Sequence, residues 1–464
     1  MFKRLATALW GKFDSAEEVK KFGFLAVIFG LIIGVYWSLR PMKDGIFNAI
    51  IGIDYQPYAK MLSVIVVFPL VIIYGKLIDM FPRNRVFYVL IGIYAALAFL
   101  FAYLLLNPSF GLLNTVKSPA RMLGWLWYVY VESFGSLIVA LFWAFTTDTT
   151  MPESAKRGFP IIALFGQIGN IVGPHFLNAK RLGFTPEVHW LGFTNSAPIV
   201  GVIGTLMIVT GFLFWVMMQA VPQSQFASYG ESDPKEKKQE ESEPGFLEGL
   251  RLLITQPYLL GIFLIITIYE VIVTVLDFHF KATAAGIYLE ESTLSSYLSE
   301  YAVLTGVVSM LCVLFGINNI QRKLGMKASL VLLPILVVFA VIMIKLNPAA
   351  LQMAFWIMVL SKAVNYALNQ PTLKQLYIPT TRETRYKSQA WIEMFGSRGS
   401  KAAGSGINTL RAPLKAQYGP IVGVNAFLTM STLISGGLIL VWLFAALFIA
   451  NTYNKAIKEN SVVC

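Results

Sequence analysis

Four charged residues lie within or at the ends of long apolar runs in this 464-residue chain. They are two cations and two acids: Lys43, Asp148, Asp277 and Lys401. A charge at the centre of a membrane helix costs about 2.5–3.5 kcal/mol on insertion scales, so such a residue is retained mainly where it performs a task. Ammonium groups pair with anionic oxygens, and carboxylates balance that charge. The set indicates a polar cavity for a charged solute inside a bundle of helices, as in a transporter.

The segment from Lys387 to Gly404 combines charges with small residues and contains the acid Glu393. Arg398 and Lys401 are three residues apart, so on a helix they share a face. Two cations that face one cavity, with small residues admitting a bulky ligand, suit a polyphosphate. The alternative is a packing role, because Gly, Ala and Ser at close spacing allow helix backbones to approach.

Two acids of the seventh expected helix, Glu270 and Asp277, are seven residues apart and therefore point to one face. Such a pair is expected to face a cavity rather than lipid. The alternative is an ion pair with Lys281 or Arg398 that only holds helices together. For Asp148, which lies beside threonines, the alternative is a cap at a helix end.

The sequence Arg40-Pro41-Met42-Lys43-Asp44 falls at the outer half of the first expected helix. Pro41 is expected to break this helix and to free backbone groups for a cavity or a neighbouring helix. Lys43 can then bind phosphate as a point charge. Alternatively, Arg40, Lys43 and Asp44 mark the helix end and extend to the membrane interface.

Several kinds of chemistry are not supported by the sequence. No GxxxxGK[ST] phosphate loop is present, so ATP hydrolysis is not indicated. There is no Ser-His-Asp set, and the two cysteines cannot form a disulfide framework or a zinc site. The three histidines are scattered. We therefore expect no enzyme activity, no catalytic residues, no metal and no cofactor.

The composition is that of a membrane protein, with 56% hydrophobic and 13% charged residues against about 45–50% and about 25% in soluble domains. Because a spanning helix needs about 20 apolar residues, we expect an all-α integral membrane fold with 12 transmembrane helices. The run at 388–410 is interrupted by charges and is retained because the topology needs it. The expected spans are 22–40, 59–78, 86–106, 124–147, 158–178, 198–220, 257–277, 296–318, 328–346, 351–368, 388–410 and 422–450.

The layout of six spans, a charged linker and six spans is typical of major-facilitator-like carriers. We expect an amphipathic N-terminal segment at 1–21, a first half at 22–221, a linker at 222–250, a second half at 251–452 and a tail at 453–464. Lys and Arg gather in loops on one side, which predicts that both termini and the linker are cytoplasmic. The net charge of +12 is explained by these loops, and we expect no nucleic-acid partner.

The loop from Gly75 to Arg85 contains an Asp four residues after the Gly, followed by a basic pair, Arg83 and Arg85. It resembles the major-facilitator loop signature, in which Asp and Arg pair with helix ends and hold one conformational state. The alternative is an ordinary basic cytoplasmic turn.

Taken together, these segments resemble the nucleotide transporter family, the ADP/ATP translocases of plastids and obligate intracellular bacteria. The resemblance extends from Lys20 to about Tyr453. It is carried by Arg40–Asp44, Leu141–Phe145, Glu153–Arg157, Phe165-Gly166 with Asn170, Tyr377–Pro379 and Lys387–Gly404. It implies a two-half, 12-helix fold and exchange of ATP for ADP in a bacterial inner membrane, and we expect a monomer in the lipid bilayer.

The resemblance also implies roles for single residues. Lys43 and Lys401 would bind the phosphates of a nucleotide. From their positions beside these lysines, we also expect Arg40 and Arg398 to contact the phosphates. Acidic residues would control gating and coupling, and polar and aromatic side chains would hold the base. These further residues are Asp148, Asp277, Glu270 and Glu393 for gating, and Asn170, Tyr366 and Trp143 for the base.

Three departures from the family pattern leave the substrate open. Asp stands at both intramembrane acid positions, where Glu is commoner, and Arg398 adds a cation near Lys401. The stretch from Asn369 to Lys374 also differs from the Phe-Asp-Pro-Thr-Lys-Glu of ATP/ADP exchangers. The alternatives are proton-coupled import of GTP or UTP, exchange of NAD for ADP, and proton symport of a non-nucleotide solute such as a peptide.

Overall fold

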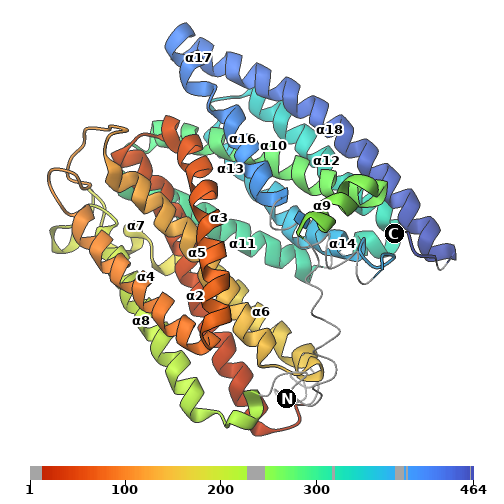
Figure 1. Cartoon of the computed structure of the whole chain (residues 1–464). Helices are drawn as coiled ribbons and strands as arrows, with labels where there is room; N and C mark the ends of the chain where they lie inside the picture. Colours follow the sequence, from red (N-terminus) through yellow and green to blue (C-terminus); the bar gives the residue numbers. More distant parts are fainter. Residues whose placement is uncertain are drawn as a thin grey trace. The chain divides into compact units, whose positions relative to one another are not determined.

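The structure is a computed structural model of the chain (Figure 1). It describes residues 13–226, 246–315, 319–381, 391–392, 396–459 and 461–463. Within these ranges the regular elements are helices, and a single isolated bridge joins Phe184 to His189. Eleven of the described helices are long and apolar enough to cross a membrane. The all-α membrane fold that the composition predicts is therefore confirmed.

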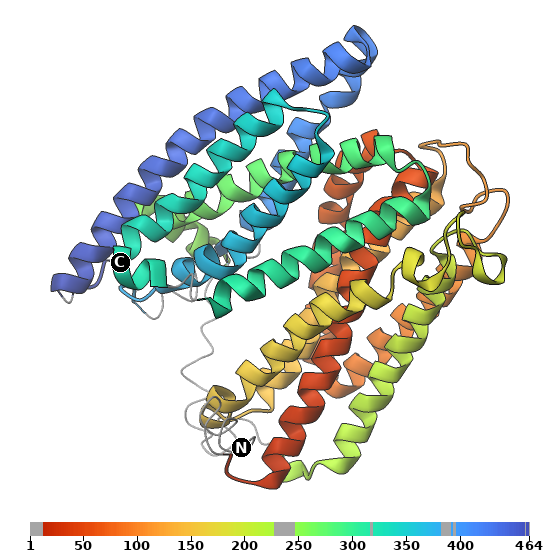
Figure 2. The ribbon, with the colours of Figure 1, turned by 180° about the vertical axis from the view of Figure 1, so that it is seen from behind.

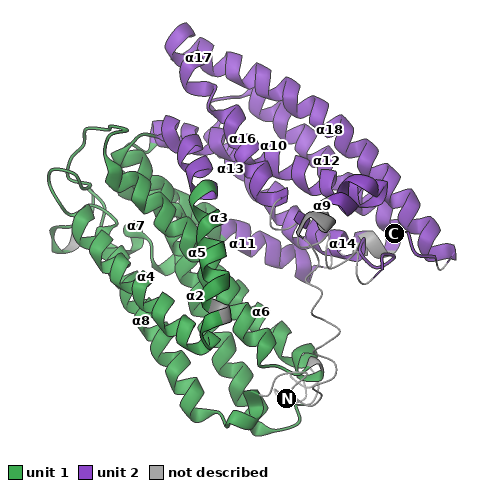
Figure 3. Ribbon diagram, in the orientation of Figure 1, with its two compact units in different colours: residues 1–52, 65–242, 288–303 green, residues 53–64, 243–287, 304–464 purple. Residues whose placement is uncertain are grey.

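The chain divides into two compact units, which are drawn in different colours in Figure 3. Unit 1 comprises residues 1–52, 65–242 and 288–303. It includes most of α3 and the first part of α11 (Glu291–Leu314). Its described elements are α2 (Ala16–Ile50), α3 (Gln56–Met80), α4 (Arg83–Leu105), α5 (Met122–Asp148), α6 (Pro152–Phe176), α7 (Ala179–Leu182), η2 (Trp190–Gly192), α8 (Ala197–Ala220) and η3 (Gln223–Phe226).

Unit 2 comprises residues 53–64, 243–287 and 304–464. It also holds the start of α3 and the second part of α11. Its other described elements are η1 (Ile53–Tyr55), α9 (Phe246–Thr255), α10 (Pro257–Ile287), α12 (Asn319–Leu346), α13 (Leu351–Val364), the π-helical η5 (Asn365–Asn369), α14 (Gln370–Gln375), α16 (Ser397–Asn408), α17 (Arg411–Tyr418) and α18 (Pro420–Glu459).

Helix α2 is the central element of unit 1 and packs on α5, α6 and α8. Its contact with α6 is made through glycines. A Cβ atom at Gly169 would lie 2.1 Å from the carbonyl oxygen of Gly30, and one at Gly173 would lie 2.3 Å from that of Gly34. The two backbones therefore touch directly, which is the arrangement that small residues four apart permit in membrane helices.

Neighbouring helices also pair along much of their length elsewhere in each unit. Figure 2 shows α4 beside α8 in unit 1 and α12 beside α18 in unit 2, as does the opposite view in Figure 1. In unit 2, α10 packs against both α16 and α18. The long α10 thus brings its charged residues next to the helix that carries Lys401.

The first helix is longer than the predicted 22–40, and the expected break at Pro41 was wrong. Helix α2 continues through Pro41 to Ile50. A proline removes one helical hydrogen bond, but neighbouring helices in a membrane bundle satisfy or shield the freed backbone group. The residues from Pro41 to Asn48 are buried by such neighbours. Lys43 therefore sits on a continuous helix, away from its end.

Other helix boundaries also differ from the predicted ones. Helix α10 extends ten residues beyond 277, so that Asp277 and Lys281 share one helix. Helix α5 ends at Asp148, as predicted. The predicted span 388–410 lies partly outside the described residues, and α16 covers its second half. The count of 12 transmembrane helices stays a prediction.

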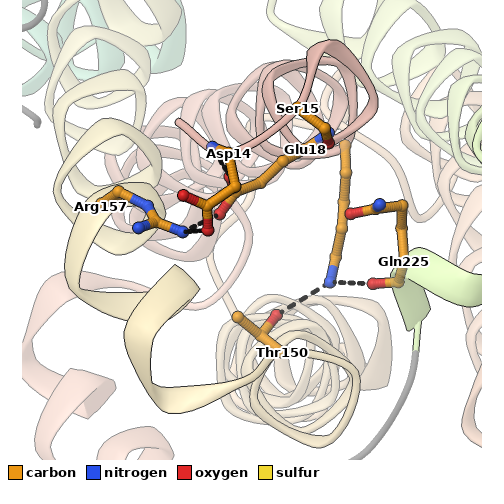
Figure 4. Close-up of polar contacts among 7 residues, drawn as sticks. Asp14, Ser15, Glu18, Thr150, Arg157 and Gln225 are labelled. Carbon is orange, nitrogen blue, oxygen red and sulfur yellow. Dashed lines mark hydrogen bonds and ion pairs between the residues drawn. The ribbon is translucent and has the colours of Figure 1, made fainter. Parts of the chain in front are cut away.

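The first turn of α2 is anchored by a group of polar contacts (Figure 4). The Arg157 guanidinium at the start of α6 pairs with Asp14 and, at 2.9 Å, with Glu18. Lys21 donates to the Thr150 hydroxyl at 3.2 Å and to the carbonyl of Gln225 in η3 at 2.8 Å. These contacts fix the beginning of α2 relative to the ends of α5, α6 and α8 within unit 1.

Candidate functional site

Lys43 is held inside unit 1 by a carboxylate and an aromatic ring. Its side chain is only 5% exposed, so the interpretation in which it extends to the interface is not what the structure shows. The Nζ forms an ion pair with Glu132 of α5 and lies 4.3 Å from the centroid of the Tyr128 ring. Burial of an ammonium group is tolerated where it is paired and hydrogen-bonded. An anionic ligand that reached Lys43 would have to replace Glu132.

Glu132 was missed by the sequence reasoning. It is an acid in the middle of an otherwise apolar helix, ten residues after the first residue of α5. That is the same signal that singled out Lys43, and it was available from the sequence. For this span the sequence predicts a functional role for Asp148, the acid at the helix end.

Asp148 belongs to a different contact. Its carboxylate lies 2.6 Å from Arg83, the first residue of α4, and its side chain is 51% exposed. Arg83 also donates to the carbonyl of Ala144 at 2.9 Å. A carboxylate at a helix C-terminus opposes the helix dipole, and the guanidinium compensates for this. Because Asp148 is 16 residues along α5 from Glu132, the two acids lie about 24 Å apart along the helix axis.

Arg40 lies one turn before Lys43 on α2. Its guanidinium is 4.6 Å from the centroid of the Trp37 ring and 5.7 Å from that of Tyr36. Such cation–π contacts hold the planar group in place.

In unit 2, Lys401 of α16 lies 3.8 Å from Glu270 of α10. Lys401 is 43% exposed, so this pair is more open than the one at Lys43. Arg398 lies one turn before Lys401 on the same helix. Gly404 follows one turn after it, and a Cβ atom there would come within 2.7 Å of the Val271 carbonyl. Glu393 lies outside the described residues.

Asp277 of α10 is shared by two lysines. One carboxylate oxygen lies 2.6 Å from Lys281, one turn along the same helix, and the other lies 2.6 Å from Lys362 of α13. The pair with Lys281 was one of the alternatives considered from the sequence. Lys362 was not identified, because it is 85 residues away in the chain.

Three residues were predicted to contact a base. Trp143 of α5 packs edge-on against Phe29 and Phe159, at centroid distances of 5.2 Å and 5.4 Å. The Oδ1 of Asn170 on α6 is buried and accepts no hydrogen bond from the described residues. Tyr366 lies in η5 and is exposed. The contact of these three residues with a base stays a prediction.

A further ion cluster lies in unit 2. Asp54 in η1 accepts from Arg411 at 2.6 Å and from Lys415 at 2.8 Å, both on α17. Arg411 is buried and also faces the Phe278 ring at 5.7 Å. Burial lowers the pKa of the Arg411 guanidinium, and the Asp54 carboxylate opposes that shift. Among the described residues, no group of three or more His, Cys, Asp or Glu side chains could hold a metal ion.

The chain matches known transport proteins over most of its length. The family model described as "TLC ATP/ADP transporter" matches residues 1–453. "ADP,ATP carrier protein 4" of Rickettsia felis is 24% identical over 457 residues, which are 88% of this chain and 87% of the relative. "ADP,ATP carrier protein 1" of Rickettsia prowazekii is 25% identical over 501 residues, 96% of this chain and 95% of the relative.

Solved structures with the same fold are transporters too. A bacterial homologue of the human lysosomal transporter Spinster, solved in an inward-facing conformation, has a TM-score of 0.63 at 14% identity and covers 96% of this chain and 99% of its own. The nucleoside transporter NupG has a TM-score of 0.59 at 13% identity and covers 94% of this chain and 99% of its own. The fold is therefore major-facilitator-like, and the protein is a multi-pass integral membrane protein. The family match confirms the resemblance noted from the sequence: this chain belongs to the TLC ATP/ADP transporter family.

Proposed function

We propose that the protein exchanges ATP for ADP across a membrane by alternating access of one nucleotide site. The observation that carries the proposal is the buried ion pair of Lys43 with Glu132 on two apolar helices of a family member. The matched relatives are named ADP,ATP carriers, which favours these nucleotides over GTP, UTP, NAD or a non-nucleotide solute. The nucleotide passes through without chemical change.

The charge of the site stays balanced during exchange in this arrangement. When the site is empty, Glu132 neutralises Lys43 and Glu270 neutralises Lys401. When a nucleotide binds, its phosphates take the place of these carboxylates as partners of the lysines. Because an unpaired charge in a low-dielectric interior is costly, each state needs either the acid or the phosphate next to the lysine. We propose that this replacement keeps the lysines paired while one nucleotide leaves and the next one binds.

We assign the remaining described residues by their surroundings and Glu393 by its place in the sequence. Arg40 and Arg398 add positive charge one turn from Lys43 and Lys401. Asn170, Trp143 and Tyr366 remain our candidates for holding the base. We propose that Asp148 acts on gating through Arg83, that Glu270 acts by pairing with Lys401, and that Asp277 and Glu393 contribute to coupling.

The placement of the chain in the membrane is also part of the proposal. The two halves are 22–221 and 251–452, joined by the linker 222–250. The segments 1–21 and 453–464 and the linker lie in the cytoplasm, and the protein acts as a monomer in a bacterial inner membrane. The excess of Lys and Arg in the loops on one side supports this orientation.

A competition experiment tests the substrate. Proteoliposomes preloaded with ADP take up labelled ATP in the presence of an excess of unlabelled ATP, ADP, GTP, UTP or NAD, at two external pH values. The proposal predicts strong competition by ATP and ADP alone, a requirement for internal ADP and no dependence on a proton gradient. Uptake into vesicles without internal nucleotide that follows the proton gradient would support symport instead.

A further inference from the structure

Part of α11 belongs to unit 1, although the residues before and after it belong to unit 2. Residues 288–303 are grouped with unit 1 and are drawn in its colour in Figure 3. Residues 243–287 and 304–464, on either side, are grouped with unit 2. We call residues 288–303 the strap. The contacts that attach the strap to unit 1 have no role in the phosphate and base sites proposed above.

The strap is held in unit 1 by a buried acid. Glu291, the first residue of α11, is only 7% exposed. Its carboxyl group accepts one hydrogen bond from the backbone N–H of Ser196 at 2.8 Å and another from the Ser295 hydroxyl at 2.6 Å. Ser196 is the N-cap residue of α8, so Glu291 joins the starts of two helices. Both donors are neutral, in contrast to the cations that pair with Glu132 and Asp277.

The strap also contacts α2 and the start of α7. A Cβ atom at Gly45 of α2 would lie 2.0 Å from the Ser295 hydroxyl oxygen, so only a glycine permits this approach. The backbone N–H of Lys180 donates to the Ser296 hydroxyl at 3.1 Å, and the Asn178 amide donates to the Ser296 carbonyl at 3.3 Å. The buried face of the strap carries four serines, which are Ser292, Ser295, Ser296 and Ser299.

This kind of contact suits a segment that docks reversibly. Hydrogen bonds to the carboxyl group favour the docked strap, but removing that group from water costs free energy that offsets part of the gain. A released strap would let Glu291 and the serines form hydrogen bonds with water instead. Because both donors to Glu291 are neutral, release separates no ion pair at this position.

We propose that Glu291 is a latch that holds the strap in unit 1 in the conformation described here, and that the strap leaves unit 1 in each transport cycle. Ser196 and Ser295 are the partners of the latch. The proposal goes beyond the proposed function, because a latch of this kind would serve a carrier of any solute. Only the transport assay below rests on ATP/ADP exchange.

Hydrogen exchange tests the anchor. Exchange of the backbone amides of the strap is followed by mass spectrometry on the purified full chain in lipid nanodiscs. We expect Glu291→Ala to speed exchange at residues 292–299 at least about tenfold, because local opening becomes easier. The matched control is Glu290→Ala, the preceding acid, which is exposed and should leave the rates unchanged. Equal rates in the two variants overturn the proposal. Should Glu291→Ala not fold, Ser295→Ala takes its place, with a several-fold effect.

Disulfide bonds test the release of the strap. In a chain with Cys312→Ser and Cys464→Ser, the strap is joined to α2 by Gly45→Cys with Ser295→Cys. The control pair, Ala98→Cys with Gly204→Cys, joins α4 to α8 within unit 1. The Cβ–Cβ distance would be 3.2 Å in both pairs. Disulfides need about 3.5–4.5 Å, so that a shift of a few tenths of an ångström suffices in each.

Oxidation of the strap pair should lower ATP/ADP exchange in proteoliposomes at least about tenfold, equivalent to about 1.4 kcal/mol, and reduction should restore it. Oxidation of the control pair should leave exchange unchanged. Equal exchange by the oxidised and reduced strap pair overturns the proposal, as does an equal loss in both pairs.

A lack of exchange in both reduced pairs would count against the proposed function and not against the latch. Release of the strap is then read from the single variant Ser295→Cys, at a position that is 2% exposed while the strap is docked. Reaction of this thiol with a water-soluble maleimide supports release. A thiol as inert as in the denaturant-free control Gly204→Cys, within α8, overturns it.

Discussion

The Nζ of Lys43 and the carboxylate of Glu132 form an ion pair that joins α2 to α5 inside unit 1. The two residues are 89 positions apart in the chain. The lysine is almost fully buried, whereas Glu132 is 29% exposed. The carboxylate is therefore the accessible partner of the pair, and the lysine is the shielded one.

Loss of the acid should destabilise the protein because Lys43 would remain buried without its partner. We expect Glu132→Gln to lower the free energy of unfolding by up to about 3–5 kcal/mol, the range for breaking a buried pair, and by less where water reaches the exposed side. A double variant, Lys43→Met with Glu132→Leu, removes both charges and should recover most of that stability. Chemical denaturation in mixed micelles measures both.

The same double variant separates folding from transport. It should be folded and yet inactive in ATP/ADP exchange, since no cation is left for the phosphates at this position. Exchange by the double variant at near wild-type rates would show that the ion pair serves only the fold.

The contact between Arg83 and Asp148 should affect the rate of ATP/ADP exchange more than the stability of the fold. Both side chains are about a third exposed or more, so the pair is worth at most about 1 kcal/mol. We expect Arg83→Gln to change the Tm little and to lower the exchange rate several-fold if the pair holds one conformational state. Exchanging the charges, with Arg83→Asp and Asp148→Arg, should restore part of the rate. If the charge-exchanged variant transports no faster than Arg83→Gln, the pair does not hold a conformational state.

The glycine contact of α2 with α6 predicts a strong effect of a very small change. In Gly173→Ala the new methyl group would meet the backbone carbonyl of Gly34 at 2.3 Å, and that atom cannot move alone. We expect a loss of about 1–3 kcal/mol, as for overpacking elsewhere, and a clear fall in Tm. Gly92→Ala on α4 is the matched control, because a Cβ atom there has nothing within 4 Å. Equal Tm values for the two variants would contradict the packing described.

The cluster of Asp54 with Arg411 and Lys415 predicts unequal effects of its two cations. Arg411 is buried and Lys415 is about a third exposed. Arg411→Met should therefore be tolerated better than Asp54→Asn, which leaves the buried guanidinium without its carboxylate. Lys415→Gln should be nearly neutral. Thermal unfolding of the three variants ranks them, and a neutral Asp54→Asn would exclude this cluster as a contributor to stability.

Much of the helical framework follows from local properties of the sequence. Apolar runs of membrane length, interrupted at a few charged positions, locate most spans, and Asp148 at the end of α5 was correctly placed. Lys43 could be identified because a lysine among apolar residues is conspicuous. Helix ends were harder to predict from the sequence. Neighbouring helices bury the residues around them, and α2 continues beyond Pro41 and α10 beyond Asp277.

The partners of the charged residues could not be predicted from the sequence, because tertiary contacts bring them together. Glu132 is 89 positions from Lys43 in the chain, and Lys362 is 85 positions from Asp277. No spacing rule applied to a single sequence connects residues so far apart. The loop signature after Gly75 pointed to an arginine that pairs with a helix end, and Arg83 does so with Asp148. Glu132 can be recognised in the sequence as an acid inside an apolar helix, but its pairing with Lys43 cannot.

The central claim is that Lys43 and Lys401 bind the phosphates of an exchanged nucleotide. The most direct measurement is ATP/ADP exchange in proteoliposomes by Lys43→Gln and Lys401→Gln, with equal amounts of folded protein verified by unfolding. The control is Lys345→Gln, a lysine of α12 that contacts Asn425 and Thr429. We predict that exchange falls at least about a hundredfold in the first two variants, equivalent to about 2.7 kcal/mol, and is unchanged in the control. Wild-type exchange in either Lys43→Gln or Lys401→Gln would contradict the account.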